Sequence, residues 1–396
     1  MQAGLDLAGI RVLDFGRYIA GPYCATLLGY LGAEVIRVEK VSGGEDRYIA
    51  PLNAEGEGSV LLQAACNKRG MTLNPLKPEG REVLARLVAS ADVVVANLPP
   101  RGLQAMGLDY ASLKAIREDI ILVSQTAFGT RGPDADKGGF DGVGQAMSGA
   151  MYMTGTAGQP VKAAAPYVDF STAVMSAFGT LAALIHRERT GEGQEVQTSL
   201  LGTALAVFNS HLVEQSVLGL DRVPTGNRVQ TSAPSDVFET RDGHVLIHTV
   251  GGGLFRRWAE LMGEPEWLDD PRFSSDQSRG DHRDVICERM QQWCAGRSTE
   301  AALAALREAG IPCGPVLNLQ QALDNPQVEA MDWLRPVDYP GLPRPARVAD
   351  LPLSFSAMDT GIRTPPPRLG EHTDAILAEL GYDAMKIAAL RDARVV

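Results

Sequence analysis

The sequence predicts an α/β fold built on a doubly wound, largely parallel sheet. Short apolar runs recur in the first half of the chain, and segments of helical character separate them. Runs such as the valines at 93–95 are continuously apolar, which is typical of strands covered on both faces. Strands and helices that alternate in this way form right-handed βαβ units. We therefore expect helices on both faces of one parallel sheet.

Each element follows from local signals along the chain. Gly21-Pro22 opens the first helix and Gly32 ends it, while Pro78 stands near the start of another helix. The expected strands are 10–15, 34–39, 92–97 and 120–125, with a short strand-like segment at 194–197. The expected helices are 23–31, 78–90, 110–117, 169–186 and 199–219, and residues 41–65 and 126–165 are expected to be loops. Long loops of this kind are often functional.

The pattern changes near Pro224-Thr225-Gly226-Asn227 and predicts a smaller α+β domain. Two apolar runs flank the turn Arg241-Asp242-Gly243, which predicts a hairpin. Helices are expected at 254–262, 282–293 and 299–308, then at 371–380 and 384–393 after a proline-rich stretch. We divide the chain into residues 1–225, 226–332 and 333–396.

Composition and charge narrow the function. The chain of 396 residues is 45% hydrophobic with a net charge of −11, which argues against nucleic acid or an anionic membrane as the main partner. The longest apolar run, at about 174–185, is shorter than the roughly 20 residues of a membrane span, and residues 1–4 do not resemble a signal peptide. The five cysteines lack metal-ligand spacing, so we expect a reduced cytoplasmic protein without a metal site.

Asp169 is the candidate that the chain is organised around. It opens a helix of small residues, where unpaired amides and the helix dipole favour an ionised carboxylate. An ionised carboxylate can act as a nucleophile. Position alone nevertheless favours a simpler role, because aspartate is a preferred helix cap.

Two glycine-containing segments are weaker candidates. The turn Gly16–Pro22 lacks the Gly-x-Gly-x-x-Gly fingerprint, so a plain structural βαβ unit competes with nucleotide binding there. Gly251-Gly252-Gly253 offers backbone amides to an anion, or simply a flexible helix entry. None of the six histidines has the spacing of a nucleophile elbow or a metal site.

Over essentially its whole length the chain resembles the class III (CaiB/BaiF type) CoA-transferases. The resemblance lies in ordered blocks that include LAGIRVLD at 7–14, AGP at 20–22, LGAEVI at 31–36, NKR at 67–69, PEGR at 78–81, ADVVVAN at 91–97, RTGEGQ at 189–194 and GEHT at 370–373. It implies a Rossmann-like large domain built from both chain ends, a smaller domain between them, and an interlocked homodimer. It also implies acyl-CoA as a substrate, with no permanently bound cofactor.

The resemblance assigns roles to particular residues. Asp169 aligns with the catalytic aspartate, and Gly252 and Gly253 belong to a loop that covers the site in relatives. The positions aligned with CoA contacts are Tyr18, Ala20, Lys40, Leu73, Asn97, Leu98, Met106 and Lys137. Lys40, Arg69 and Lys137 are our candidates for the CoA phosphates, because compact cations suit phosphate. Position 105 is alanine where a relative carries a basic residue, so one phosphate contact is missing or supplied elsewhere.

The expected reaction passes CoA from an acyl-CoA to a carboxylic acid through an aspartyl anhydride and an aspartyl-CoA thioester. Amides near Asp169 or in the triple glycine are candidate oxyanion donors. We expect a succinyl-CoA-like donor and a short dicarboxylate such as itaconate, mesaconate or citramalate. Arg17, Tyr18 and Arg228 are candidates for its far carboxylate. Formyl-CoA transferases carry glutamine where Ile19 stands, which argues against oxalate or formate.

Three alternatives stay open. A 2-methylacyl-CoA racemase of the same superfamily needs a proton-transfer pair, and racemases place histidine where this chain has Phe140 in Gly139-Phe140-Asp141. A non-catalytic CoA-binding or scaffold protein would not depend on Asp169. A nicotinamide oxidoreductase is disfavoured by the missing glycine fingerprint.

Overall fold

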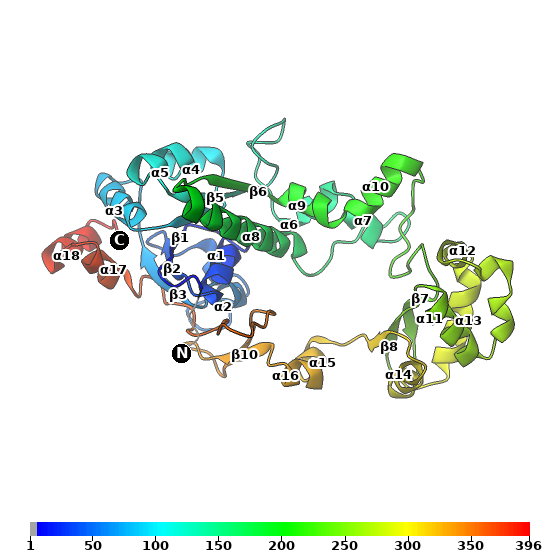
Figure 1. Ribbon diagram of the computed structural model, residues 1–396. Helices are drawn as coiled ribbons and strands as arrows, with labels where there is room; N and C mark the ends of the chain where they lie inside the picture. Colours follow the sequence, from blue (N-terminus) through cyan, green and yellow to red (C-terminus); the bar gives the residue numbers. More distant parts are fainter. Residues whose placement is uncertain (1–5) are drawn as a thin grey trace. The chain divides into compact units, whose positions relative to one another are not determined.

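The computed structural model describes residues 6–396 and divides into two compact units. Unit 1 comprises residues up to Ala150, Ala163–Glu214 and Pro326–Val396, whereas unit 2 comprises Met151–Lys162 and Gln215–Asn325. Figure 1 shows the elements of each unit along the chain. Residues 1–4, which we expect not to form a signal peptide, lie outside the described residues.

Unit 1 contains a six-stranded sheet in the order β3-β2-β1-β4-β5-β6. Every neighbouring pair of its strands is parallel. The strands are β1 (Arg11–Asp14), β2 (Glu34–Glu39), β3 (Lys68–Thr72), β4 (Val93–Ala96), β5 (Ile121–Thr126) and β6 (Glu195–Ser199). This is the strand order of doubly wound nucleotide-binding folds, in which the winding reverses between β1 and β4. The predicted α/β class and parallel sheet are confirmed.

Apolar side chains of successive strand residues point to opposite faces, and each face is covered. Val12 faces the cluster formed with α1 (Ala20–Tyr30) and α8 (Tyr167–Thr190), whereas Leu13 faces the other cluster. That second cluster takes side chains from α3 (Pro78–Ala89), α4 (Pro100–Met106), α5 (Tyr110–Ile116), α17 (Thr373–Glu379) and α18 (Ala384–Asp392). Segments from both ends of the chain therefore share the core of unit 1.

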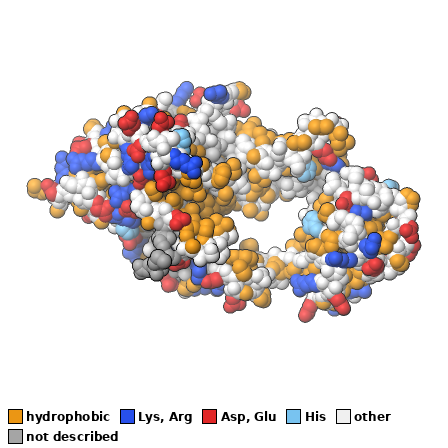
Figure 2. All heavy atoms as spheres, in the orientation of Figure 1, with side chains coloured by type: hydrophobic (Ala, Val, Ile, Leu, Met, Phe, Trp, Pro, Cys, Tyr) orange, Lys and Arg blue, Asp and Glu red, His pale blue; other side chains and the backbone are white. Residues whose placement is uncertain are grey.

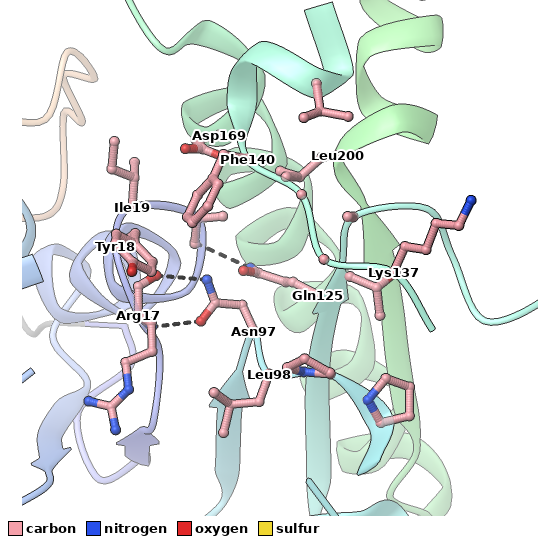
Figure 3. A pocket seen from close by; sticks show the side chains of 18 of the residues that line it. Arg17, Tyr18, Ile19, Asn97, Leu98, Gln125, Lys137, Phe140, Asp169 and Leu200 are labelled. Carbon is pink, nitrogen blue, oxygen red and sulfur yellow. Dashed lines mark hydrogen bonds between the residues drawn. The ribbon is translucent and has the colours of Figure 1, made fainter. Parts of the chain in front are cut away.

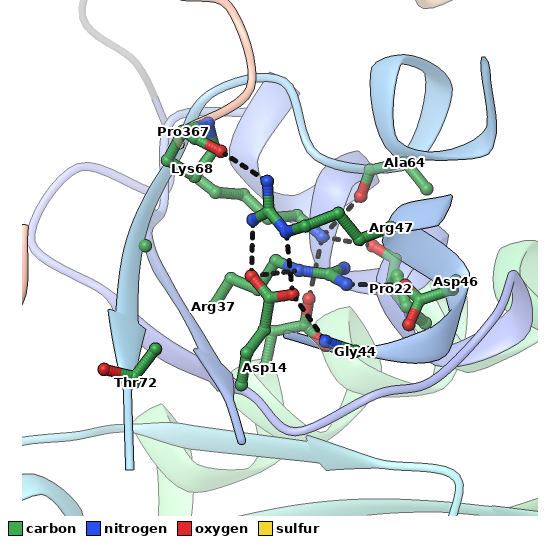
Figure 4. A network of polar contacts seen from close by, with 12 residues as sticks. Asp14, Pro22, Arg37, Gly44, Asp46, Arg47, Ala64, Lys68, Thr72 and Pro367 are labelled. Atoms are coloured by element: carbon green, nitrogen blue, oxygen red, sulfur yellow. Dashed lines mark hydrogen bonds and ion pairs between the residues drawn. The ribbon is translucent and has the colours of Figure 1, made fainter. Parts of the chain in front are cut away.

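The sequence reading missed strand β3, because its residues, Lys-Arg-Gly-Met-Thr, do not form an apolar run. Lys68 is buried, and its ammonium is 2.8 Å from the buried Asp14 carboxylate. Figure 4 shows this pair beside a second buried group of charges. In that group Glu39 accepts from Arg47, and Arg37 pairs with both Glu39 and Asp46. Buried charges persist when each has a partner, so polar residues can occupy this sheet interior.

Helix α8 is longer and more apolar than the sequence reading expected. Its 24 residues make it the one helix, among the described residues, that could cross a membrane by length and composition. The expectation of a shorter apolar run was wrong because Ser176 and Thr180 do not interrupt the helix: their hydroxyls bond to backbone oxygens one turn earlier. Ala173 and Ala177 pack in the core beside the sheet, as in a core helix.

Both expected loops contain short helices, and the expected helix 199–219 is two helices. These and the other elements of this part of the chain are η1 (Glu45–Tyr48), α2 (Ser59–Ala64), α6 (Asp141–Met147), α7 (Ala150–Thr154), α9 (Leu200–Val207), α10 (Asn209–Leu218), α16 (Pro326–Ala330), and the antiparallel pair β10 (Leu334–Val337) and β11 (Ala346–Ala349). The short lengths of η1, α2, α6 and α7 explain why no periodic signal revealed them in the two expected loops.

Unit 2 has an antiparallel sheet in the order β7-β8-β9 and its own core around the buried Trp258. The predicted hairpin corresponds to β7 (Ser235–Glu239) and β8 (His244–His248), to which β9 (Cys313–Pro315) adds. The helices are α11 (Gly252–Met262), η2 (Pro265–Leu268), η3 (Pro271–Phe273), α12 (Asp276–Asp281), α13 (Arg283–Ala295), α14 (Thr299–Glu308) and α15 (Leu319–Leu323).

The unit boundaries differ from the predicted divisions at 225 and 332. Residues 151–162 and 215–225 belong to unit 2 because the two segments meet: Thr156 bridges Thr225, and the Gly226 amide donates to the Gly155 carbonyl over 2.9 Å. Residues 326–332 belong to unit 1, where the adjoining Trp333 carbonyl accepts from the Asp350 amide. Composition alone did not reveal either pairing.

Candidate active site

A cavity of about 380 Å³ lies in unit 1 at the carboxyl ends of the central strands, and we call it the Asp169 cavity. Its walls come from the turn after β1, the segments after β4 and β5, the loop before α6, and the starts of α8 and α9. Ligands of doubly wound sheets bind at this edge, next to the strands where the winding reverses. Figure 3 shows Asp169, Tyr18, Ile19 and Gln125 around it.

Asp141 holds the first turn of α8 in place. One of its carboxylate oxygens accepts from the Val168 amide over 2.8 Å and from the Asp169 amide over 3.3 Å. The other oxygen accepts from the Gln145 side chain, whose own oxygen accepts from the Ala163 amide. The capping role that position alone suggested for Asp169 therefore belongs to Asp141, and the carboxylate of Asp169 is left to line the cavity.

Asp169 is buried, with 8% of its surface exposed. Its burial, followed by the negative charge of Asp141, raises its pKa to about 7. The expectation that the helix start keeps this carboxylate firmly ionised was wrong, because Asp141 takes the amides that would stabilise the charge. Near neutral pH the group is close to half ionised. Because its pKa is raised, its charged form is a stronger nucleophile than the carboxylate of an exposed aspartate.

The turn after β1 is fixed by Asn97, which follows β4. The Asn97 side-chain oxygen accepts from the Arg17 amide over 2.6 Å, and its amide group donates to the Arg17 carbonyl over 2.7 Å. Tyr18 is in the left-handed region, at φ 60°. A Cβ on Gly21 would lie 2.9 Å from the Gly16 Cα and 3.0 Å from the Asn97 oxygen, so the close approach requires glycine.

Phe140 lines the cavity beside this turn and packs against Tyr18 with the two rings nearly perpendicular and their centroids 5.0 Å apart. It is 57% exposed. Among the described residues, no histidine lines this cavity. Phenylalanine cannot transfer a proton, so the second group of a racemase-type pair is missing at this position.

A second cavity, of about 640 Å³, also includes Arg17 of the turn after β1 in its wall, and we call it the Lys40 cavity. Lys40, Leu73, Lys77, Met106 and Arg394 are among its walls. Arg17 lines both cavities, and Figure 3 shows its guanidinium extending away from Asp169. One buried nitrogen of that guanidinium has no hydrogen-bond partner among residues 6–396. The Asp169 and Lys40 cavities of unit 1 therefore share Arg17 as a wall residue.

Comparison with known proteins decides the class. The model of CoA-transferase family III matches residues 7–373. The chain belongs to CoA-transferase family III. A succinate–glutarate CoA-transferase of Agrobacterium fabrum is 33% identical, over 94% of this chain and 95% of its own. A succinyl-CoA–D-citramalate CoA-transferase of Chloroflexus aurantiacus is 32% identical, over 98% of both chains.

A solved structure agrees with this assignment. The crystal structure of a CaiB/BaiF family protein from Brucella suis superposes with a TM-score of 0.83 at 32% identity, and covers 95% of this chain and 99% of its own. The stated resemblance to class III CoA-transferases is confirmed, and the protein is an enzyme of that class.

The transferase brings most of the predicted contact residues to the two cavities. Those that line the Asp169 cavity are Asp169, Arg17, Tyr18, Ile19, Ala20, Asn97, Leu98 and Lys137. Lys40, Leu73 and Met106 line the Lys40 cavity. The Lys137 ammonium pairs with Asp134 and extends away from Asp169 in Figure 3, so it does not face the carboxylate.

Two predicted cations have other partners. Arg69 lines neither of the two cavities, and its guanidinium contacts Glu34 at 2.7 Å and Glu379 at 2.7 Å. Arg228 lies in unit 2 and contacts Asp236 and Asp284. These carboxylates already neutralise both guanidinium groups, so the proposed contacts to a CoA phosphate and a substrate carboxylate lack structural support.

The triple glycine is not a loop. Gly251 precedes α11 at φ 88°, and Gly252 and Gly253 form its first turn. The Gly251 amide donates to both oxygens of Asp276, whereas first-turn amides such as those of Gly252 and Gly253 have no acceptor within their helix. The segment lies in unit 2, and its part in the reaction stays a prediction.

Sequence reasoning missed Asp141, Gln125, Lys77 and Arg394. Gln125 ends the predicted strand 120–125, a position that faces ligands in parallel sheets, so this signal was available. Its side-chain nitrogen bonds to Ser176 and to the Ala20 carbonyl, and its buried oxygen has no protein partner. Among the described residues, no group of three or more metal-ligating side chains occurs.

The raised pKa of Asp169 predicts a pH profile. If the reaction uses the ionised carboxylate, kcat/KM should increase as pH rises through about 7 and then level off. Asp141→Asn removes the neighbouring negative charge, which lowers the pKa of Asp169 and should move this rise to lower pH. Asp119→Asn, a change at an acid paired with Arg117, is the control and should leave the profile in place. Identical profiles in all three proteins would contradict this electrostatic link.

Proposed function

We propose that this transferase moves CoA from succinyl-CoA to a short dicarboxylic acid, with Asp169 as the residue that carries the CoA. The observation that carries the proposal is the buried Asp169 carboxylate lining a cavity at the carboxyl ends of the sheet strands. Relatives named for succinyl-CoA and for succinate with glutarate support the donor and the acceptor class. Itaconate, mesaconate and citramalate remain our candidate acceptors.

The first half-reaction loads the enzyme. A carboxylate oxygen of Asp169 attacks the thioester carbonyl, the carbon–sulfur bond breaks, and CoA leaves as a thiolate. The acyl group is then joined to Asp169 as a mixed anhydride. The thiolate then attacks the Asp169 carbonyl carbon, and the donor acid leaves as a carboxylate. The product is an aspartyl-CoA thioester, and two moderate steps replace one difficult exchange.

The second half-reaction unloads the enzyme. The acceptor carboxylate attacks the aspartyl thioester, which releases the thiolate and forms a second anhydride. Attack of the thiolate on the acceptor's carbonyl carbon makes the new acyl-CoA and returns Asp169 as a carboxylate. Burial of Asp169 limits access of water to both anhydrides and to the thioester, each of which water would hydrolyse.

Charge on the tetrahedral intermediates needs hydrogen-bond donors, and the start of α8 does not supply them. The amides of Val168 and Asp169 donate to Asp141, and those of Tyr167 and Phe170 donate to the Ala165 and Pro166 carbonyls. The expectation that amides next to Asp169 stabilise the oxyanion is therefore not supported. The first-turn amides of Gly252 and Gly253 remain our proposed donors.

The two cavities divide CoA between them. We place the thioester end in the Asp169 cavity, beside Tyr18 and Asn97, and the nucleotide end in the Lys40 cavity. Arg17 stands between them with an unpartnered buried nitrogen, which suits a CoA phosphate better than the far carboxylate of the acid that we first assigned to it.

A covalent adduct provides the primary test. We expect incubation with succinyl-CoA, followed by peptide mass spectrometry, to show CoA attached at Asp169. Asp169→Asn should lose the adduct and at least about a thousandfold in kcat, because the nucleophile is gone. Asp269→Asn changes an exposed aspartate of unit 2 and should retain both. An adduct elsewhere, or an active Asp169→Asn enzyme, would refute the proposal.

Acceptor choice has a separate test. With succinyl-CoA as donor, initial rates should favour short dicarboxylates over acetate, propionate and butyrate by roughly tenfold or more, the effect of one ionic contact. Turnover of monocarboxylates alone would contradict the dicarboxylate assignment, while the proposed role of Asp169 would stand.

We also propose a homodimer, which the family resemblance implies. Helix α8 carries an exposed apolar stripe at Val174, Phe178 and Ile185, with Phe178 67% exposed, and Figure 2 shows apolar side chains gathered over this helix. Such a stripe is typical of a surface covered by a partner.

Light scattering should give twice the chain mass, and Phe178→Glu should lower the measured mass. Met385→Glu, at an exposed apolar residue of α18, is the control. A monomeric wild-type protein would contradict the proposal.

A further inference from the structure

The Lys40 cavity combines apolar walls with several cations. Its apolar residues are Phe15, Val38, Val41, Leu73, Pro75, Leu76 and Met106. Its cations are Arg17, Lys40, Lys77 and Arg394, and Glu39 is its one acidic side chain. An apolar space edged by positive charge suits a planar base attached to phosphates.

The single acid in the wall does not offset these cations. Glu39 is 1% exposed, and its carboxylate is 2.6 Å from the Arg47 guanidinium and 3.3 Å from that of Arg37. Lys40 pairs with Glu45 at the surface. Lys77 donates to the Ala393 carbonyl, and no carboxylate in the described part of the chain pairs with its charge. Arg17 has the unpartnered nitrogen described above, so the cavity carries excess positive charge.

Arg394 reaches this cavity because the turn after α18 is bonded to the segment after β3. The Asn74 amide donates to the Val395 carbonyl over 2.7 Å, and the Lys77 ammonium donates to the Ala393 carbonyl. Val395 and Val396 are buried in the core of unit 1. Arg394 itself is in the left-handed region at φ 51°, a costly conformation for arginine that these contacts maintain.

We propose that Arg394, together with Lys77, binds the 3′-phosphate on the ribose of CoA and so makes the enzyme prefer CoA over dephospho-CoA. This inference rests on the proposed function, because it takes CoA as the occupant of the Lys40 cavity. The diphosphate lies nearer the Asp169 cavity, at Arg17, since the pantetheine arm must reach Asp169. The phosphate farthest from the thioester then falls to cations that line only the Lys40 cavity.

Calorimetric titration with CoA and with dephospho-CoA tests the assignment. Wild-type protein should bind CoA roughly tenfold or more tightly than dephospho-CoA, the effect of one charged hydrogen bond to phosphate. Arg394→Ala should weaken CoA binding by a similar factor and leave dephospho-CoA binding unchanged. Arg394→Lys keeps the charge and should retain part of the preference.

Arg391→Ala provides the matched control. Arg391 lies on the last turn of α18, pairs with Asp374 and does not line the cavity, so its loss should change neither titration. Equal weakening of both ligands in Arg394→Ala, or no weakening at all, would overturn the inference, as would the same loss in Arg391→Ala. Wild-type protein that binds both ligands equally would overturn it too, while failure to bind either would count against the proposed function itself. Thermal unfolding of each variant confirms that it is folded.

Discussion

The site depends on the hydrogen bonds from the first turn of α8 to the buried carboxylate of Asp141. They hold the helix start against α6, and they use the amides that would otherwise stabilise a charge on Asp169. The same carboxylate therefore fixes where Asp169 lies and makes its ionisation harder. Asp141 therefore sets both the position and the reactivity of the proposed nucleophile. A neutral asparagine at 141 would change the pKa of Asp169, although its side-chain oxygen could still accept the hydrogen bonds from the two amides.

The parallel sheet brings the rest of the site to this helix. Segments after β1, β4 and β5 meet at one edge, and Asn97 bonds the turn that holds Arg17. The buried charges beneath that turn, from Lys68–Asp14 to Arg47–Glu39, occupy what would otherwise be apolar core. Buried charges that are all paired fix the positions of the residues that carry them, and here they lie beside the wall of the Lys40 cavity.

Some of this was predictable from the sequence. Strand 34–39 matches β2 because Val35, Ile36 and Val38 give it a strand-like pattern, whereas β3 was missed because Lys68 and Arg69 interrupt its apolar pattern. Tyr18 and Asn97 were identified through the family resemblance, as positions aligned with CoA contacts. The role of Asp141 was not, since its partners lie 27 and 28 residues later. The carboxylates paired with Arg228 and Arg69 become their neighbours only in the fold, so these ion pairs were not foreseen. Lys77 likewise bonds to the Ala393 carbonyl, more than 300 residues later in the chain.

In the proposed reaction the carboxylate of Asp169 exchanges an oxygen atom with the donor and acceptor acids. The most direct measurement supplies an acceptor acid labelled with heavy oxygen in its carboxylate, allows turnover, and weighs the peptide that contains Asp169. Passage through an aspartyl anhydride leaves one acceptor oxygen on Asp169, so the peptide should become heavier by about 2 Da for each labelled oxygen retained. Complete turnover with an unlabelled Asp169 peptide would contradict the account.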